Sequence, residues 1–310
     1  MLQPDHVAFA DLSTPCLVVD GPALQRNIDK MAGLARFAGV KLRPHAKTHM
    51  DHPHQVEALA SALQPGDPQF GVLVDVDVGQ ARTGVVDIAD GLRLAQLIAQ
   101  QPKLKFMGIQ GFAGNAQHIP DFVERREAAQ KAANKLSVLR EVLSLEGLSP
   151  AIITGSGTGT QNFDAQGPYT ELQVGSYVFM DADYDRIRDE RDEPPPFEPS
   201  LFVLATVVSV NRAEEVTVDA GTKALATNGP APVVLLGAPA ASRYRFGGDE
   251  HGILSIPSRQ PPPRLGARVL IGATHCDPTV NLHGCYYEFG DEAVRKWPIL
   301  GRYGAYEVAL

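Results

Sequence analysis

Strand-like and helix-like segments alternate along the first part of the sequence, from residue 40 to residue 185. The apolar runs that read as strands begin near residues 40, 71, 104, 151 and 174. Helix-period segments lie between them, at 56–63, 88–99 and 122–145. This alternation predicts parallel strands joined by crossover helices, as in a (β/α) barrel. A complete barrel has eight strands in about 250 residues, so the five strands found in this part of the chain predict an incomplete, barrel-like domain.

A second, β-rich part follows a charged and proline-rich segment from Arg188 to Ser200, which reads as a linker. Strand-like runs recur beyond it, at 201–210, 216–219, 233–236, 268–271 and 286–289. The sequence thus predicts a mixed α/β protein. Its parts would be a barrel domain over residues 26–186, a linker over 187–200 and a β-domain over 201–310.

The composition is that of an ordinary globular protein, with 310 residues, of which 44% are hydrophobic and 21% charged. A formal net charge of -8 gives no reason to expect binding to nucleic acid or to an anionic membrane. No apolar run approaches the ~18 residues of a membrane span, and the N-terminus lacks the plan of a signal peptide. Three cysteines are too few for a disulfide framework and suit a reducing compartment. We therefore expect a cytoplasmic protein.

Lys47 is the first candidate for chemistry. It lies in the cation-rich run Arg43–His49, where the first predicted barrel strand ends. The carboxyl ends of barrel strands share one face, and that face carries the active site. A lysine that loses solvent among other cations has a lowered pKa, and its neutral amine attacks carbonyls, including that of an aldehyde cofactor. The alternative is a surface lysine beside a strand end.

A glycine-rich loop, Thr154–Thr160, follows the fourth predicted barrel strand. Its glycines would let backbone amides approach an anion and its hydroxyls would add donors, so the loop suits a phosphate. It lacks the lysine of a P-loop, which disfavours a nucleotide. Gly175, Ser176 and Tyr177 form a second candidate donor turn. For both segments the alternative is a glycine-rich turn that binds no ligand.

His275 and Asp277 form a candidate metal site. On extended backbone, residues two apart project to the same side, so this pair would share a face while Cys276 points away. An imidazole and a carboxylate suit Mn²⁺, Mg²⁺ or Zn²⁺, and the lack of a thiolate on that face favours the harder ions. Two protein ligands leave positions for water and substrate. The alternative is an ordinary pair of loop side chains.

His118 follows the predicted strand Leu104–Phe112 and is a candidate proton carrier. The alternative is a loop histidine that is hydrogen-bonded to the backbone. A further histidine, His251, lies beside Asp249 and Glu250 in the predicted β-domain. We expect that loop to be solvated, or to support the metal region from outside the inner ligands.

These motifs, in this order, resemble the family of D-threonine aldolases and D-serine dehydratases, which have a fold of the alanine-racemase type, with a pyridoxal-phosphate barrel and a β-domain. The resemblance covers nearly the whole chain. It runs through Thr14 and Pro15, Arg43–His49, Asp77–Gly79 with Arg82 and Gly84, Gly114 with Gln117 and His118, Gly155–Thr160, Gly175–Tyr177, Asp219–Gly221 with Lys223, Glu250–Gly252, and His275–Thr279. It also implies that a first strand within residues 1–25 joins the β-domain.

The resemblance implies a role for each candidate. Lys47 would hold pyridoxal 5'-phosphate as a Schiff base and act as a base, and Arg82 would face the cofactor ring or its phenolic oxygen. His118 would help to remove the proton of the substrate β-hydroxyl. A divalent metal, Mn²⁺ or Mg²⁺ rather than Zn²⁺, would be held by His275 and Asp277. The cofactor phosphate would be bound by Gly157, Thr158, Gly175 and Ser176, with Tyr177 in the same turn.

The implied activity is that of a lyase acting on small β-hydroxy D-amino acids, with a D-threonine aldolase, which releases glycine and an aldehyde, favoured. The His-x-Asp metal motif resembles this enzyme more than the D-serine dehydratase branch, which generally has His-x-Cys and zinc. A dehydratase of D-serine or D-3-hydroxyaspartate is the alternative. Relatives of this fold commonly form dimers, so the resemblance implies a homodimer.

The sequence departs from the family pattern in two places. About three β/α units are absent between Pro53 and Gly71, where the barrel wall that follows the strand of Lys47 would lie. Phe112 stands where the family often has a tyrosine. The shortened barrel leaves open a further hypothesis, a relative that folds without catalysing the reaction.

Overall fold

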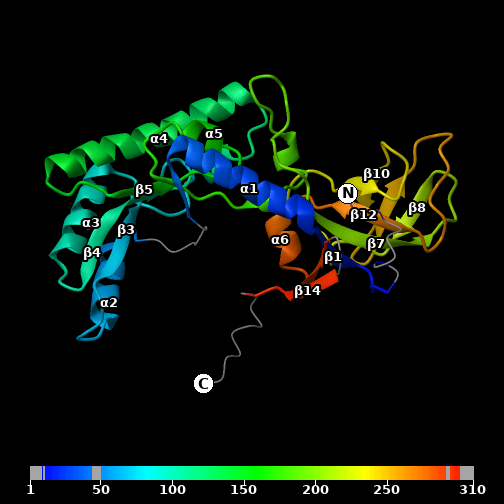
Figure 1. Ribbon diagram of the computed structural model, residues 1–310, viewed down its shortest axis with the longest axis horizontal. Helices are drawn as coiled ribbons and strands as arrows, with labels where there is room; N and C mark the ends of the chain where they lie inside the picture. Colours follow the sequence, from blue (N-terminus) through cyan, green and yellow to red (C-terminus); the bar gives the residue numbers. More distant parts are fainter. Residues whose placement is uncertain (1–8, 10, 44–49, 291–293, 301–310) are drawn as a thin grey trace. The chain divides into compact units, whose positions relative to one another are not determined.

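The computed structural model describes residues 9, 11–43, 50–290 and 294–300 of the chain, and Figure 1 labels its elements. The chain divides into two compact units. An α/β unit comprises Met31–Gly175 and Ile187–Pro194, and a β-rich unit comprises Met1–Lys30, Ser176–Arg186 and Pro195–Leu310. Helix α1 (Gly21–Ala38) runs from the second unit into the first. Within the described ranges, no helix is long and apolar enough to cross a bilayer.

The α/β unit contains a parallel sheet of five strands in the order β2-β6-β5-β4-β3. These strands are β2 (Lys41–Leu42), β3 (Phe70–Asp75), β4 (Leu104–Gly111), β5 (Ile152–Gly155) and β6 (Glu171–Leu172). The helical elements are α2 (Pro53–Ala62), α3 (Ile88–Gln100), η2 (Gly114–Ala116), α4 (Phe122–Leu145) and α5 (Gln161–Asp164). The predicted alternation of parallel strands and helices is therefore confirmed.

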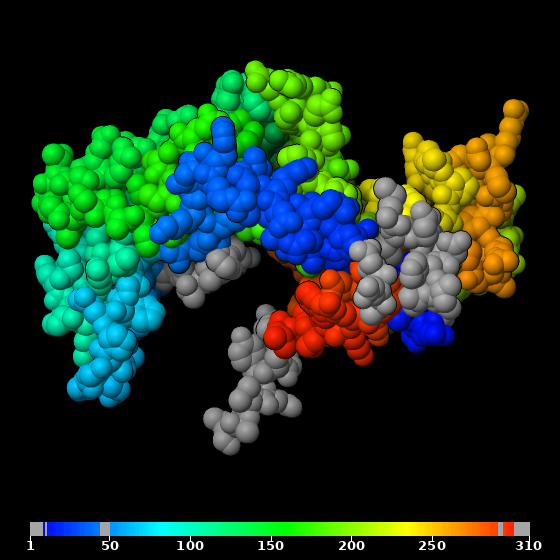
Figure 2. Space-filling model, in the orientation of Figure 1, coloured from blue at the N-terminus to red at the C-terminus, as the bar shows by residue number. Residues whose placement is uncertain are grey.

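The edge strands of this sheet, β2 and β3, follow one another in the chain with only α2 between them. Consecutive strands of a (β/α) barrel lie side by side, so the side left open between β2 and β3 is where further β/α units would fit. Helix α2 has correspondingly little to pack against. Val56 is the buried residue of α2. The surface of helix α2 is coloured light blue in Figure 2. The prediction of an incomplete barrel is thus confirmed for the residues described.

Two backbone hydrogen bonds fix the chain on either side of residues 44–49, which lie outside the description. The Arg43 N–H donates to the Leu172 carbonyl over 3.0 Å, next to β2. The Asp75 N–H donates to the Met50 carbonyl over 2.9 Å, at the carboxyl end of β3. Arg43 and Met50 are therefore attached to opposite edges of the same sheet.

The fifth predicted strand is displaced. We predicted it to begin near Val174, whereas β6 ends at Leu172 and the 3-10 turn η3 (Ser176–Val178) follows. The buried hydrophobic side chains that follow β6 are Val174, Tyr177 and Met180, which are spaced by three. This is the period of a 3-10 helix rather than the period of two that marks a strand.

The β-rich unit contains a nine-stranded sheet in the order β12-β9-β10-β11-β8-β7-β1-β13-β14. These strands are β1 (Cys16–Asp20), β7 (Leu201–Ser209), β8 (Glu215–Val218), β9 (Val233–Leu236), β10 (Arg243–Phe246), β11 (Gly252–Ser255), β12 (Arg268–Gly272), β13 (Cys285–Phe289) and β14 (Val294–Pro298). Strand β12 also pairs with β7, so the strands from β12 to β7 close into a barrel. The N-terminal strand β1 pairs with β7 and β13. The unit is completed by η4 (Tyr184–Arg186) and helix α6 (Cys276–Val280).

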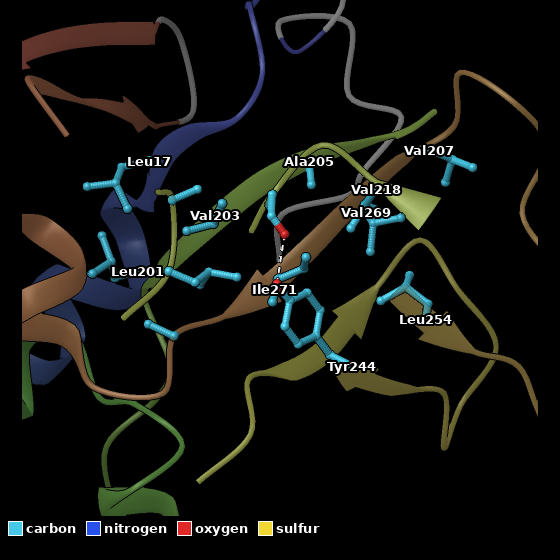
Figure 3. Close-up of a cluster of buried hydrophobic side chains, with 14 of the residues drawn as sticks. Leu17, Leu201, Val203, Ala205, Val207, Val218, Tyr244, Leu254, Val269 and Ile271 are labelled. Atoms are coloured by element: carbon cyan, nitrogen blue, oxygen red, sulfur yellow. Dashed lines mark hydrogen bonds between the residues drawn. The ribbon is translucent and has the colours of Figure 1, made fainter. Parts of the chain in front are cut away.

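The main hydrophobic core of the β-rich unit is shown in Figure 3. Five strands each contribute a side chain with no exposed surface: Leu17, Val203, Val218, Leu254 and Ile271. Burial of one such side chain stabilises a fold by about 1.5–3 kcal/mol. Strand β12 is part of this core and directly precedes α6, so the core fixes the position at which α6 begins.

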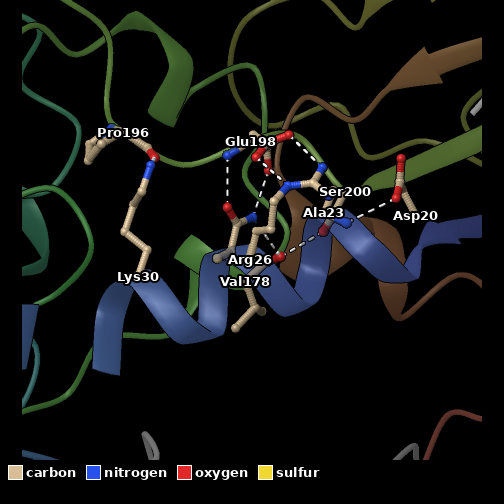
Figure 4. A network of polar contacts seen from close by, with 9 residues as sticks. Asp20, Ala23, Arg26, Lys30, Val178, Pro196, Glu198 and Ser200 are labelled. Atoms are coloured by element: carbon tan, nitrogen blue, oxygen red, sulfur yellow. Dashed lines mark hydrogen bonds and ion pairs between the residues drawn. The ribbon is translucent and has the colours of Figure 1, made fainter. Parts of the chain in front are cut away.

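A polar network attaches the start of α1 to residues 196–200, as Figure 4 shows. Arg26 donates two hydrogen bonds of 2.8 Å to the Glu198 carboxylate. The buried Asn27 side chain donates to the Glu198 carbonyl over 2.7 Å and accepts from its N–H over 2.9 Å. Exposed ion pairs contribute at most about 1 kcal/mol, so the buried amide is the firmer link. The second half of the proline-rich segment therefore packs with the β-rich unit.

Candidate functional site

A row of polar residues crosses the α/β sheet near the carboxyl ends of its strands. Asp75 of β3 lies in register with Gln110 of β4, and Gln110 with Thr154 of β5. Thr154 is in register with Glu171 of β6, and Glu171 with Lys41 of β2. Residues in register on parallel strands point to the same face. Of the five, only Thr154 belonged to a candidate motif, the glycine-rich loop. The other four were missed, although each lies within or beside an apolar run, which was the available signal.

Gln173, directly after β6, links this row. Its Nε2 donates to Gln110 Oε1 and to Thr154 Oγ1, in each case over 3.1 Å. Gln110 Nε2 lies 3.3 Å from Asp75 Oδ1. Asp75, Thr154 and Gln173 are buried. A hydrogen-bonded polar layer therefore covers the strand ends, which is where (β/α) barrels place their active sites.

The sequence predicted two cationic residues for the site, Lys47 and Arg82. Lys47 lies outside the described residues, whereas Arg82 lies in the segment that follows β3. Just before Arg82, the Asp77 carboxylate accepts hydrogen bonds from the N–H groups of Gly79 and Ala81, over 2.9 and 3.0 Å. Burial raises the pKa of Asp77, but these hydrogen bonds outweigh it and bring the pKa below its ordinary value. The ionised Asp77 thus fixes the turn from which Arg82 projects.

Arg82 contacts Phe112, the residue that stands in place of a tyrosine. The guanidinium carbon lies 5.9 Å from the centre of the phenyl ring. This is the distance of a cation–π contact. A phenyl ring retains that contact but has no hydroxyl, so residue 112 of this chain positions Arg82 without offering a proton or a hydrogen bond.

His118 lies in the loop after β4, and two buried neighbours hold that loop. Arg125 of α4 donates from Nη1 to the carbonyls of Ile119 and Pro120, over 2.7 and 3.0 Å. On the other side of His118, Gln117 is only 1% exposed. His118 itself is half-buried. Its imidazole is therefore carried by a loop that is fixed on both sides.

The glycine-rich loop after β5 packs against the loop of His118. The Gly159 N–H donates to Gln117 Oε1, and Gln117 Nε2 donates to Thr160 Oγ1, both over 3.0 Å. Thr158, one of the predicted phosphate ligands, is 5% exposed. Gly157 and Thr158 are therefore placed in a loop whose conformation is set by hydrogen bonds to a neighbouring loop.

The other predicted phosphate ligand of this unit, Gly175, is exposed. A side-chain carbon added to Gly175 would meet no atom within 4 Å. Chain packing therefore does not require a glycine at this position, while open space beside a glycine lets a ligand approach the backbone. The open Gly175 and the buried hydroxyl of Thr158 fit the phosphate group of pyridoxal phosphate.

Asp164, at the end of α5, supports the glycine-rich loop from inside the fold. It accepts hydrogen bonds from Thr160 Oγ1 over 2.5 Å and from the Ser156 side chain. It is 3% exposed, and burial raises its pKa from 3.8 to about 6. An acid whose folded-state pKa is raised favours the folded state while both states are protonated, and that advantage is lost as the pH rises through the folded-state pKa.

We therefore expect the free energy of unfolding of the parent protein to fall between pH 4 and pH 7, relative to an Asp164→Asn variant, by up to about 3 kcal/mol. Urea unfolding of both proteins at several pH values measures this difference. Asp249→Asn, which changes an exposed carboxylate, is the control and should follow the parent. A difference between parent and Asp164→Asn that does not vary with pH would contradict the expectation.

His275 and Asp277 lie together at the start of α6. His275 Nε2 is 3.9 Å from Asp277 Oδ2. Cys276 between them is 1% exposed and belongs to the hydrophobic core, but its Sγ also donates to Asp277 Oδ1 over 3.7 Å, so it does not point away from the pair as expected. The expected extended backbone is wrong, because only His275 is extended (φ -141, ψ 124) and Cys276 begins a helix. The first helical turn, rather than strand alternation, brings the pair together.

The surroundings of this pair leave it open to further ligands. Asn228 Nδ2 lies 2.8 Å from His275 Nδ1, which directs Nε2 towards Asp277. The Asp277 side chain is 72% exposed. No group of three His, Cys, Asp or Glu side chains that could hold a metal occurs among the described residues. An imidazole and a carboxylate in this arrangement fit a divalent ion that takes its other ligands from water and substrate.

Ser176, a predicted phosphate ligand, contacts helix α6. Its hydroxyl is hydrogen-bonded to the Cys276 side chain, and the Cys276 N–H donates to Asp181 Oδ2 over 2.9 Å. The ring of Tyr177 is buried, with its centre 5.5 Å from that of Phe197. Within the β-rich unit, the turn of Ser176 and Tyr177 thus lies against the residue between the two predicted metal ligands.

Two protein-family models match the chain. The model of the alanine racemase N-terminal domain matches residues 41–183. The model of a putative serine dehydratase domain matches residues 200–289. The first covers the polar layer, Arg82, His118 and the glycine-rich loop, and the second covers His275 and Asp277.

Individual relatives resemble almost the whole chain. A D-threonine aldolase of Arthrobacter sp is 38% identical over 286 residues, which are 92% of this chain and 72% of the relative. A 3-hydroxy-D-aspartate aldolase of Paracoccus denitrificans (strain Pd 1222) is 28% identical over 363 aligned positions, covering 94% of this chain and 93% of the relative. Because that alignment is longer than the 310 residues of this chain, a part of the relative has no counterpart here. The crystal structure of D-threonine aldolase from Filomicrobium marinum superposes with a TM-score of 0.86 at 30% identity, over 93% of this chain and 95% of the other.

Proposed function

Because this chain belongs to the D-threonine aldolase family, we propose that it is a pyridoxal-phosphate-dependent lyase that cleaves the Cα–Cβ bond of β-hydroxy D-amino acids. The observation that carries the proposal is the first turn of α6. There His275 and Asp277 lie 3.9 Å apart, and Ser176 contacts the cysteine between them. A short helix that would present a metal-binding pair, and that contacts a proposed cofactor ligand, suits an enzyme that uses a divalent metal together with pyridoxal phosphate.

We propose the following ligands for the cofactor. Lys47 would bind it covalently, and Arg82, fixed by Phe112 and Asp77, would supply positive charge beside its ring. The phosphate ligands would be Gly157, Thr158, Gly175 and Ser176, with Tyr177 packed behind their turn. When bound, pyridoxal phosphate supplies an electron sink for the charge left on the substrate Cα.

The metal would be held by His275 and Asp277. Mn²⁺ and Mg²⁺ would suit this imidazole–carboxylate pair better than Zn²⁺, because the Cys276 thiol is buried and donates to Asp277 Oδ1 over 3.7 Å instead of facing solvent beside His275. A divalent ion lowers the pKa of a hydroxyl that it binds. His118 would accept the proton of the β-hydroxyl, and rupture of the Cα–Cβ bond would then give an aldehyde and, after Cα is protonated, glycine.

His118→Asn tests the role of the imidazole. General acid–base catalysis by a side chain contributes about 10²–10⁴-fold, so we expect kcat for D-threonine to fall within that range while cofactor binding is retained. His54→Asn is the matched control, because the His54 side chain is 87% exposed on α2. Steady-state rates of acetaldehyde formation measure the effect. An unchanged kcat in His118→Asn would exclude His118 as the proton acceptor.

Product analysis tests the reaction itself. The purified protein, supplied with pyridoxal phosphate and Mn²⁺, is expected to convert D-threonine, but not L-threonine, to glycine and acetaldehyde. Glyoxylate and glycine from D-3-hydroxyaspartate would show the same bond cleavage on another substrate. Pyruvate from D-serine or oxaloacetate from D-3-hydroxyaspartate would instead identify a dehydratase. Absence of any product would support the hypothesis of a non-catalytic relative.

We also propose that the protein is a homodimer. Strands β2 and β3 lie at the two edges of the α/β sheet, and sheet edges that lack a partner strand favour association. Light scattering coupled to gel filtration should give twice the mass of the 310-residue chain, and a monomeric mass would contradict the proposal.

A further inference from the structure

Gln117 connects two loops that are far apart in sequence. It follows η2, in the loop after β4, and its side chain is hydrogen-bonded to three buried residues: Ala113, Gly159 and Thr160. Its Nε2 donates to the Ala113 carbonyl over 3.1 Å and to Thr160 Oγ1 over 3.0 Å, and its Oε1 accepts from the Gly159 N–H over 3.0 Å. The amide group of Gln117 therefore joins its own loop to the glycine-rich loop, 42 residues further along the chain.

The glycines of the second loop make room for this side chain. A carbon added to Gly157 would lie 2.4 Å from Gln117 Oε1 and 2.6 Å from its Cδ. A carbon added to Gly159 would lie 1.9 Å from the backbone oxygen of Gln117. Neither glycine has a positive φ, so their backbone conformation is open to alanine. It is contact with Gln117 that makes these two positions glycine.

We infer that Gln117 is a positioning residue that holds the predicted phosphate loop and the loop of His118 in one fixed arrangement. Gln117 directly precedes His118. The N–H group that the Gln117 side chain binds is that of Gly159, which follows Gly157 and Thr158. The contact itself stands on the fold alone, whereas its consequence for catalysis rests on the proposed function. In this arrangement a displacement of either loop moves both the phosphate ligands and the proton acceptor.

A pair of glycine substitutions tests the contact in the protein without cofactor. Overpacking of a close-packed interior is destabilising, so Gly157→Ala and Gly159→Ala should each lower the Tm by on the order of 5 °C. In a Gln117→Ala background the side chain that opposes residue 157 is gone, and Gly157→Ala should cause little further loss. Gly159→Ala is the matched control: it meets backbone, so it should remain destabilising in both backgrounds. An equal loss from Gly157→Ala in both backgrounds would overturn the inference.

The same variants, loaded with cofactor, separate this inference from the proposed function. If Gly157 is glycine because of Gln117, the double variant Gln117→Ala/Gly157→Ala should bind pyridoxal phosphate as tightly as Gln117→Ala does, by absorbance titration. A tenfold weaker affinity in the double variant would show that the phosphate, rather than Gln117, requires a glycine at position 157, and would overturn the inference. A parent protein that binds no pyridoxal phosphate would refute the proposed function, while the Tm comparison would still decide the role of Gln117.

Gln117→Glu tests the consequence for His118. The replacement keeps the shape and Oε1 but directs a second acceptor at the Ala113 carbonyl, and Thr160 already donates its proton to Asp164. Loss of buried hydrogen bonds of this kind corresponds to about tenfold. We expect a fall in kcat of at least that size together with a shifted pH profile, whereas Gln130→Glu, on the exposed face of α4, should match the parent. A lowered Tm with kcat and pH profile unchanged would overturn the positioning role.

Discussion

Replacing Lys47 by alanine is expected to abolish the visible absorbance of the bound cofactor and to lower the rate of D-threonine cleavage by at least about a thousandfold. A lysine amine is the one side-chain group that links covalently to an aldehyde cofactor and can also serve as a base afterwards. Among the proposed cofactor and metal ligands, Lys47 is the one with such an amine, so the loss should affect binding and catalysis together.

The residues around Lys47 support this expectation. Arg43, which precedes residues 44–49 in the chain, is bonded to β6, and Met50 is bonded to β3, in each case near the carboxyl end of the strand. The polar layer that contains Asp75 and Gln173 lies at these same ends. A lysine that loses solvent beside other cations has a lowered pKa, which favours the nucleophilic amine.

The matched control is Lys131→Ala, which removes an exposed amine from α4 and should leave absorbance and rate unchanged. Absorbance that persists in Lys47→Ala would assign the covalent link to another lysine. A parent protein that shows no such absorbance when mixed with pyridoxal phosphate would exclude the enzyme hypothesis altogether.

The elements with strong local signals could be predicted from the sequence. Helix α4 was predicted at 122–145 and occupies those residues, because Asp121 caps its first turn through the Glu124 N–H and Gly147 follows its end. Strands β3, β4 and β9 were recognised because each is a run of apolar residues between turns. Strands β10 and β11 were missed. The sequence Arg-Tyr-Arg-Phe of β10 is not an apolar run, and the sequence Gly-Ile-Leu-Ser of β11 has only two large apolar residues.

The site was predictable in its residue types and not in its contacts. The order of motifs identified His275 and Asp277, but their proximity comes from a helical turn that the pattern did not indicate. The glycine-rich loop was recognised, yet its glycines were interpreted only as an approach route for an anion. Packing of Gln117 against Gly157 joins residues 40 apart in sequence, and a single sequence contains no periodicity from which such a contact can be derived.

Replacing His275 by alanine is expected to remove metal dependence and to lower the cleavage rate by at least about a hundredfold. His275 supplies the nitrogen ligand of the proposed pair, and its ring is oriented by Asn228. Metal binding through Nε2 requires the proton to be on Nδ1. The Nδ1–H group can then donate a hydrogen bond to Asn228 once the Asn228 amide turns over to present its oxygen. We therefore expect three graded losses of Mn²⁺ affinity, with His275→Ala the largest, Asp277→Asn next and Asn228→Ala the smallest.

Calorimetric titration of Mn²⁺ into each protein measures these losses, and the cleavage rate after treatment with a chelator measures the dependence on metal. The control is His251→Ala. It lies in the same unit, is exposed, and follows a glutamate that pairs with Lys223 on the surface. The parent should lose activity with chelator and recover it with Mn²⁺, and His251→Ala should do the same. Equal Mn²⁺ affinity in the parent and in His275→Ala would show that the metal of this enzyme is bound elsewhere. Activity that survives chelation in the parent would leave His275 and Asp277 as side chains that fix the start of α6 without holding an ion.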